Sequence, residues 1–194
     1  RQMCIRDRVS ANLRGSKADL WDGGHRIPFI VKWPGRVKAG SQSDQLICLT
    51  DLFSTVGEII GVKVPSGSCE DSVSFLPALF GEKIKSTRKG LIHHSISGHF
   101  AYRMGKWKLL LAKASGGWSS PKENQVKAGA PRAQLYDMER DIGEQKNLYE
   151  NEPEIASAIL LQLERDVRRG RSMDGPKSKN DIAEIELWKS LSNR

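Results

Sequence analysis

The chain has 194 residues, of which 38% are hydrophobic and 28% are charged, and its formal net charge is +8. This length suffices for one domain or for one and a half. No apolar run approaches the roughly 20 residues that span a bilayer, and the three cysteines include no Cys-x-x-Cys pair, so that neither a membrane helix nor a cysteine zinc site is predicted. The basic balance fits a solvated cationic surface, a nucleic-acid or membrane partner, or a site that attracts anionic substrates.

The first eight residues, Arg-Gln-Met-Cys-Ile-Arg-Asp-Arg, differ in composition from everything that follows. We interpret residues 1–8 as a non-native leader, translated from adapter or vector sequence, and exclude them from the fold. They carry three Arg and one Asp, so that the net charge without them is +6. The chain that remains is therefore still basic.

Two elements are predicted in the first half of the chain. The apolar run over residues 27–33 ends at Trp-Pro-Gly, and continuous runs of this kind are typical of a central strand covered on both faces. A helix is predicted from Asp51, with Thr50 as its N-cap and Gly61 in the left-handed position after its end. Its apolar residues recur at helical spacing and are expected to face the core: Phe53, Val56, Ile59 and Ile60.

From residue 91 onward the apolar period becomes two, which predicts strands over residues 91–96, 100–104 and 106–112 and a fourth over 134–138. Gly105 is expected to close a hairpin between the second and third strands. In the third strand, Trp107, Leu109 and Leu111 share one face, and Lys108, Leu110 and Ala112 share the other.

A last helix is predicted to begin at Pro153, where a missing amide donor is harmless, and to end before Gly170. Its buried stripe consists of Ile155, Ile159, Leu163 and Val167. The charged, glycine-bounded stretch over residues 81–90 suggests a boundary. The predicted parts are residues 9–82, residues 83–175 and a polar tail over 176–194.

Three motifs in this order resemble one family. Residues 14–35 contain Arg-Gly-Ser-Lys, then Asp-Gly-Gly-His-Arg-Ile-Pro, and end at Trp-Pro-Gly. From His93 the chain reads His-His-Ser-Ile-Ser-Gly-His-Phe-Ala-Tyr-Arg-x-Gly-Lys-Trp-Lys-Leu, and Leu135-Tyr-Asp is followed by Asp141-x-Gly-Glu-x-x-Asn. These motifs are similar to those of the type I (formylglycine-dependent) sulfatases, which hydrolyse sulfate esters.

The resemblance implies an alkaline-phosphatase-like α/β fold, of which this chain is the C-terminal fragment. Residues 9–82 would complete the large sheet domain. Residues 83–175 would form a small antiparallel α+β subdomain. The family is largely exported or lysosomal, which suggests a periplasmic, extracellular or lysosomal protein.

The resemblance also assigns roles to individual residues. It implies that Lys17 contacts the sulfate group, a role that suits an ammonium because charge-assisted hydrogen bonds stabilise developing negative charge. His93 and His94 are candidate substrate contacts, although neighbours on one strand point to opposite faces, so that at most one faces a cleft and a purely structural histidine is the alternative. Arg26 is expected to pair with Asp22 or Asp19.

The chain does not supply the whole of the family's chemistry. None of its cysteines begins the Cys-x-Pro-x-Arg motif that yields formylglycine, and a zinc site from His93, His94 and His99 has no evident fourth ligand. The resemblance implies that the formylglycine and the Ca²⁺ ligands lie upstream. We therefore predict that this fragment alone is inactive. Trp118, in a Gly-Gly-Trp loop, is a candidate for a platform under a sugar ring, and packing on neighbouring residues is the alternative.

Two other readings stay open at this point. The first is a phosphatase or phosphodiesterase of the same superfold, because phosphate and sulfate share their shape. The second is a noncatalytic module that binds anionic polysaccharide. The expected partner is a sulfated small molecule or polysaccharide, whereas nucleic acid is not predicted, because the chain has no basic stripe interleaved with aromatics.

Overall fold

The computed structural model describes residues 10–65 and 67–189, so that the leader predicted over residues 1–8 lies outside the described residues. The chain divides into two compact units. Of the described residues, unit 1 comprises 10–27, 92–164 and 184–189, and unit 2 comprises 28–65, 67–91 and 165–183. The domain boundaries predicted from the sequence stay a prediction.

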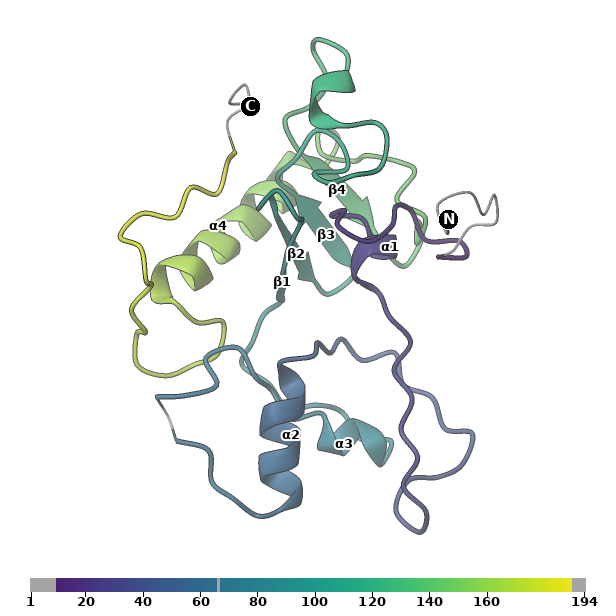
Figure 1. Ribbon diagram of the computed structural model, residues 1–194, viewed down its shortest axis with the longest axis vertical. Helices are drawn as coiled ribbons and strands as arrows, with labels where there is room; N and C mark the ends of the chain where they lie inside the picture. Colours follow the sequence, from purple (N-terminus) through teal and green to yellow (C-terminus); the bar gives the residue numbers. More distant parts are fainter. Residues whose placement is uncertain (1–9, 66, 190–194) are drawn as a thin grey trace. The chain divides into compact units, whose positions relative to one another are not determined.

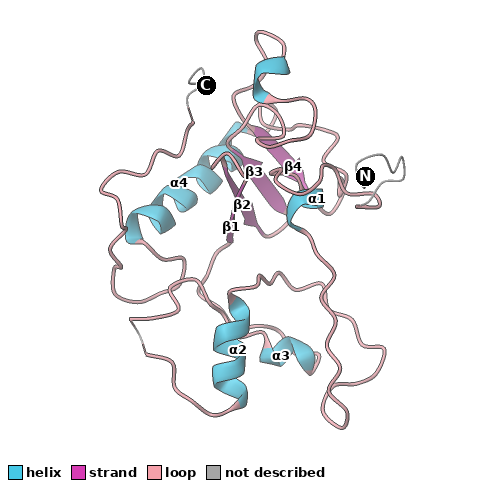
Figure 2. Ribbon diagram, in the orientation of Figure 1, coloured by secondary structure: helices cyan, strands magenta, loops and turns pink. Residues whose placement is uncertain are grey.

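Figure 1 shows the elements of the chain, and Figure 2 shows that loops connect them over long stretches. In chain order they are α1 (Asp22–His25), α2 (Asp51–Ile59), α3 (Leu76–Leu79), β1 (Leu91–His94), β2 (Phe100–Met104), β3 (Trp107–Leu110), the 3-10 helix η2 (Glu123–Gln125), β4 (Gln134–Asp137) and α4 (Pro153–Arg169).

The four strands form one sheet in the order β1-β2-β3-β4, which confirms the strands predicted from the period of two. β2 and β3 are antiparallel, with Tyr102 opposite Leu109, and β3 and β4 are antiparallel, with Leu109 opposite Leu135. Gly105 has a φ of 55° in the turn between β2 and β3, as the predicted hairpin requires. Sequential strands thus lie side by side, which is the usual arrangement, although the connection between β3 and β4 is long and contains η2.

Each face of this sheet is buried by a different part of unit 1. On one face, Leu20 and Trp21 form a buried cluster with Ala101, Leu110, Ala112, Tyr136 and Met138. On the other face, Leu109 and Leu135 are buried. Ile159 and Leu163 of α4, which Figure 1 draws beside the strands, are completely buried as well. Leu20 and Trp21 thereby anchor the segment before α1 on the sheet.

Helix α4 has the bounds that the sequence predicts. It begins at Pro153, and Gly170 follows it with a φ of 64° in the left-handed region. Of its predicted stripe, Ile159 and Leu163 are fully buried. In the part of the chain that the structure describes, no helix combines the length and the apolar character needed to cross a bilayer.

Unit 2 is organised around the carboxylate of Asp51, at the first position of α2. Both oxygens accept hydrogen bonds from Arg88, over 2.6 and 2.8 Å, and Oδ1 also accepts one from the amide of Val73 at 2.9 Å. Thr50 occupies the predicted N-cap position without a capping bond from its side chain, and Asp51 instead accepts the amide of Cys48. Gly61, with a φ of 71°, confirms the predicted left-handed end of the helix.

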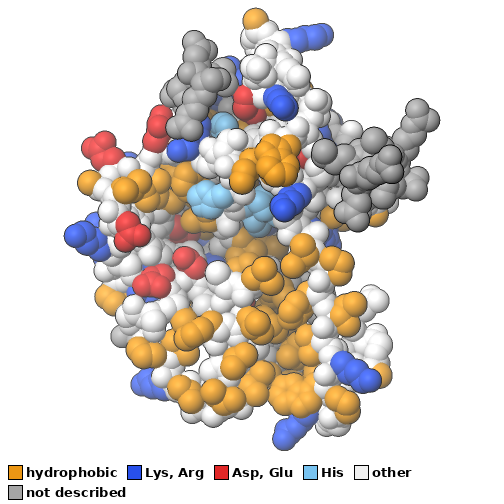
Figure 3. All heavy atoms as spheres, viewed as in Figure 1, with side chains coloured by type: hydrophobic (Ala, Val, Ile, Leu, Met, Phe, Trp, Pro, Cys, Tyr) orange, Lys and Arg blue, Asp and Glu red, His pale blue; other side chains and the backbone are white. Residues whose placement is uncertain are grey.

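Two expectations for this unit are wrong. Residues 27–33 form no strand, because no strand among the described residues pairs with them, and Ile30 is 90% exposed. The apolar residues of α2 do not face a core either, since Phe53 is 62% and Val56 is 44% exposed. The helical period predicts the apolar stripe of α2 correctly, but such a stripe is buried only where another element packs on it. Figure 3 shows hydrophobic side chains exposed at the surface.

Candidate functional site

Lys17 lies in an exposed turn of unit 1 whose base is fixed by a buried tryptophan. Trp21 is 1% exposed and donates from Nε1 to Oε1 of Gln134 at 3.1 Å. The guanidinium of Arg14 lies 3.8 Å from the centroid of the indole ring. A side chain of this size, buried and hydrogen-bonded, anchors the segment on the sheet, so that the turn beside it has a defined position.

The backbone on both sides of Lys17 is also held. The amide of Ser16 donates to Oδ2 of Asp19 at 2.8 Å, and the carbonyl of Ala18 accepts the amide of Ile96 at 3.0 Å. Ile96 lies two residues beyond the end of β1. These bonds join the turn that carries Lys17 to the end of the strand that carries His93 and His94.

A buried ion-pair triad lies under this segment. Nζ of Lys108 contacts Oδ1 of Asp22 at 2.7 Å and Oε1 of Glu144 at 2.8 Å, and the side chains of Lys108 and Glu144 are completely buried. Burial opposes the ionisation of Asp22, but the charge and the hydrogen bond of Lys108, together with the charge of Arg103, outweigh it and hold the pKa of Asp22 below its usual value. Burial dominates at Glu144 and raises the pKa of that carboxyl. The triad thus joins α1, β3 and the Asp-x-Gly-Glu turn.

The expected ion pair of Arg26 is wrong. Asp22 pairs with Lys108 instead, and Asp19 accepts backbone amides. The Arg26 side chain is exposed. A largely buried carboxylate requires a buried cation, and the fold brings Lys108, not Arg26, to Asp22.

His93 packs against His25, a residue to which the sequence analysis gave no role. Their ring centroids are 4.9 Å apart, and Nε2 of His25 is buried without a hydrogen-bond partner among the described residues. Burial, together with the charge of Lys108, lowers the pKa of His93 to about 3 and also lowers the pKa of His25. His93 is therefore neutral near pH 7, and it can exchange hydrogen bonds but cannot bind an anion by charge.

His94 has a different environment. Its ring lies 4.2 Å from that of Phe100 in an edge-on arrangement, and its side chain is exposed. Partial desolvation of the ring lowers the pKa of His94, and the charge of Lys189 lowers it further. The two histidines thus have separate partners, as alternation along a strand predicts. Figure 3 shows histidine side chains at the surface beside basic and hydrophobic ones.

The neutral state of His93 predicts a pH-dependent stability. An unfolded histidine has a pKa near 6.5, so that below this pH the unfolded chain binds a proton that the folded chain does not bind. The contribution of His93 to the free energy of unfolding should therefore fall by about 1.4 kcal/mol per pH unit as the pH drops from 6.5 towards 3. Urea denaturation at pH 4–7 should show a flatter pH dependence for His93→Phe than for the wild type.

The exposed His94 supplies the control, because His94→Phe removes a histidine from the same strand. His94→Phe should change the pH dependence of the free energy of unfolding less than His93→Phe does. Equal slopes for the wild type and for His93→Phe would contradict the neutral state of His93. Glu144 also contributes to the pH dependence of the free energy of unfolding, with the opposite sign to His93. This contribution is common to the wild type and both variants, so that it cancels when their slopes are compared.

A comparison with protein families decides what this segment belongs to. The family described as "N-sulphoglucosamine sulphohydrolase, C-terminal" matches residues 16–118, which is more than half of the chain. The chain belongs to the sulfatase family. It corresponds to the C-terminal part of a sulfatase, as the sequence motifs predicted, and Lys17, His93 and His94 all lie within the matched range.

Curated relatives agree with this family. The sulfatase chain is 30% identical over 155 residues to N-acetylgalactosamine-6-O-sulfatase of Bacteroides thetaiotaomicron, covering 78% of this chain and 29% of the relative. It is 30% identical over 149 residues to arylsulfatase G of Rattus norvegicus, covering 72% of this chain and 27% of the relative. The chain thus spans less than a third of the length of these relatives.

Solved structures confirm the predicted fold class. A Bacteroides thetaiotaomicron structure, described with a core genetic locus for the metabolism of multiple glycosaminoglycans, has a TM-score of 0.66 and 28% identity, covering 79% of this sulfatase chain and 32% of that one. The structure of i-CgsB in complex with a neocarrahexaose has a TM-score of 0.62 and 24% identity, with 79% and 31% covered. The second likeness concerns the fold alone.

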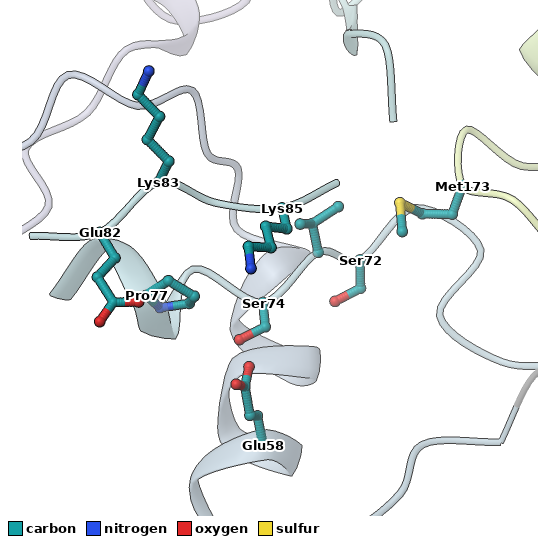
Figure 4. A pocket seen from close by; sticks show the side chains of 9 residues that line it. Glu58, Ser72, Ser74, Pro77, Glu82, Lys83, Lys85 and Met173 are labelled. Atoms are coloured by element: carbon teal, nitrogen blue, oxygen red, sulfur yellow. The ribbon is translucent and has the colours of Figure 1, made fainter. Parts of the chain in front are cut away.

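The structure also forms a pocket in unit 2, whereas the predicted site residues belong to unit 1. Figure 4 shows that Lys85 and Glu58 approach Ser74, whereas Lys83 points away. The lining consists of Glu58, Ser72, Val73, Ser74, Pro77, Glu82, Lys83, Lys85 and Met173. Its mixture of two acidic and two basic side chains gives it no single electrostatic preference.

Proposed function

We propose that this chain is the C-terminal part of a sulfatase that hydrolyses sulfate esters of carbohydrates or aryl alcohols, and that Lys17 binds the sulfate group. The observation that carries the proposal is the position of Lys17. Its side chain is exposed on a turn that is fixed by Asp19 and Trp21, inside the range that matches the family. A cation on a held turn is preorganised for an anion.

Lys17 would act through its charge. The ammonium would donate charge-assisted hydrogen bonds to sulfate oxygens. When the ester bond breaks, negative charge develops on oxygen, and a positioned ammonium stabilises that charge more in the transition state than in the ground state. Such differential stabilisation raises the rate and not only the affinity.

His93 and His94 would border the substrate in this proposal. His93 would offer a neutral ring nitrogen to a hydroxyl or amide group of the substrate, since its lowered pKa leaves it uncharged. His94 is exposed and would contact a more distal group. Neither role requires proton transfer.

Sulfatases generally use Ca²⁺ and a formylglycine, and the described residues do not fit a calcium site. Within residues 10–65 and 67–189, no three His, Cys, Asp or Glu side chains are grouped so that they could hold a metal ion. The buried carboxylates of Asp19, Asp22 and Asp51 each accept hydrogen bonds from protein donors instead. We therefore assign the calcium ligands and the nucleophile to the upstream part of the longer protein.

The proposal is tested by assaying two proteins with paired esters. The longer protein that contains this chain should hydrolyse 4-nitrophenyl sulfate or a sulfated sugar, and it should not turn over 4-nitrophenyl phosphate at a comparable rate. The 194-residue chain alone should hydrolyse neither ester, because it lacks the nucleophile.

Three results would overturn the proposal. Preference of the longer protein for the phosphate ester would favour the phosphatase reading. Turnover of the aryl sulfate by the 194-residue chain would show that the nucleophile lies within it. An inactive longer protein that binds sulfated polysaccharide, with steeply salt-dependent affinity, would favour the binding module.

A further inference from the structure

The indole of Trp118 lies open to solvent in a loop of unit 1. Its side chain is 60% exposed, although it follows the buried residues Ser115 and Gly116. A single exposed aromatic residue is common on protein surfaces, so that exposure alone assigns no role. A role for Trp118 follows from the position of its loop relative to Lys17.

One buried carboxylate holds the loop of Trp118 and the turn of Lys17 together. Oδ1 of Asp19 accepts the amides of Trp118 at 2.8 Å and Ser119 at 3.0 Å. Oδ2 of the same carboxylate accepts the amide of Ser16, which precedes Lys17. Asp19 is completely buried, so that these three bonds are shielded from water and keep the two segments in register.

Close backbone packing fixes the same pair of loops. A Cβ atom at Gly117 would collide with the carbonyl oxygen of Ala18, so that only glycine permits this approach. The amide of Leu20 donates to the carbonyl of Ser115 at 2.8 Å, and the hydroxyls of Ser16 and Ser119 are 3.2 Å apart. An exposed aromatic ring on so constrained a backbone loses little entropy when it binds a ligand.

We propose that Trp118 is the sugar platform of the sulfate site: its indole face would stack on the C–H face of a pyranose ring whose sulfate group reaches Lys17. The negative π-face of the indole attracts the weakly positive C–H groups of a sugar, while the ammonium binds the anion. The substrate class is then a sulfated carbohydrate. This inference rests on the sulfate-binding role proposed for Lys17.

Binding of three probes to the 194-residue chain tests the inference: N-acetylgalactosamine 6-sulfate, unsulfated N-acetylgalactosamine and inorganic sulfate. The readout is the NMR signal of the Trp118 indole N–H, identified by its loss in Trp118→Phe. Both sugars should shift this signal. Trp118→Ala should weaken binding of the sulfated sugar about tenfold and leave binding of inorganic sulfate unchanged, and Trp118→Phe should retain most of the affinity.

Leu161→Ala is the matched control, because Leu161 is 69% exposed on α4 of the same unit. It should change no affinity. Unchanged sugar binding by Trp118→Ala, or no indole shift with the sulfated sugar, would overturn the platform. Equal weakening for inorganic sulfate would also overturn it, because Trp118 would then only support the turn of Lys17.

The two proposals fail in different ways. If Lys17→Ala loses the preference for the sulfated sugar while Trp118→Ala keeps full affinity, the platform is wrong and the role of Lys17 stands. If Trp118→Ala weakens the binding of both sugars while Lys17→Ala keeps the preference for sulfate, the platform stands and the role of Lys17 is wrong. A loss of thermal stability by Trp118→Ala in the longer protein, without any change in KM, would make Trp118 a packing contact and overturn the platform.

Discussion

Replacing Lys17 with alanine in the longer sulfatase should lower kcat/KM for its sulfate ester by about 10²–10³-fold. This is the loss expected when one preorganised donor is removed from a site where negative charge develops. The free energy of unfolding should stay nearly unchanged, because the side chain is exposed. Steady-state kinetics and urea denaturation of the same protein preparations measure the two quantities.

Lys113→Ala is the matched control for this prediction. Lys113 is also an exposed lysine of unit 1, and its loss should change neither quantity. A normal rate for Lys17→Ala would remove Lys17 from the site. An equal loss in both variants would point to the overall positive charge of the surface, since long-range steering depends on net charge and not on one position.

Replacing Lys108 with methionine should lower the free energy of unfolding by about 3–5 kcal/mol. The methionine keeps an unbranched apolar stem but leaves the carboxylates of Asp22 and Glu144 buried without their shared cation. The cost is therefore that of two unpaired charges and not of a cavity. Urea denaturation of the 194-residue chain at pH 7 measures it.

Lys106→Met tests whether burial is the cause. Lys106 also contacts a carboxylate, that of Asp137, at 2.7 Å, but its side chain is 34% exposed. A partly hydrated pair of this kind contributes at most about 1 kcal/mol. If Lys108→Met and Lys106→Met were equally stable, burial of the Lys108 triad would not be the cause of the predicted loss of stability.

Elements that depend on local pattern were predicted well, and elements that depend on distant partners were not. The four strands and α4 follow from the spacing of their apolar residues and from Gly105, Pro153 and Gly170, which mark a turn, a helix start and a helix end. Both signals act over a few residues. The run over residues 27–33 has the composition of a strand, but a strand exists only where another strand pairs with it. Composition gives no information about that partner.

The site shows the same division. A family motif predicted Lys17 as a site residue, and that role stays a proposal, whereas the sequence analysis did not recognise the structural roles of Lys108 and Asp19. A signal for Lys108 was present, since alternation places it on one face with Leu110 and Ala112, where a lone lysine requires a buried anion. Its partners Asp22 and Glu144 are 86 and 36 residues away in the chain, and only the tertiary fold brings them together.

The shared carboxylate of Asp19 has a consequence for how such an enzyme can change its preference. Because one side chain sets the spacing between two segments about 100 residues apart, neither segment can lengthen or tilt without displacing the other. Recognition of the ester and of the group that bears it would then diverge together during evolution. A graft that imports a new loop around residue 118 should carry the matching residues 16–19 with it.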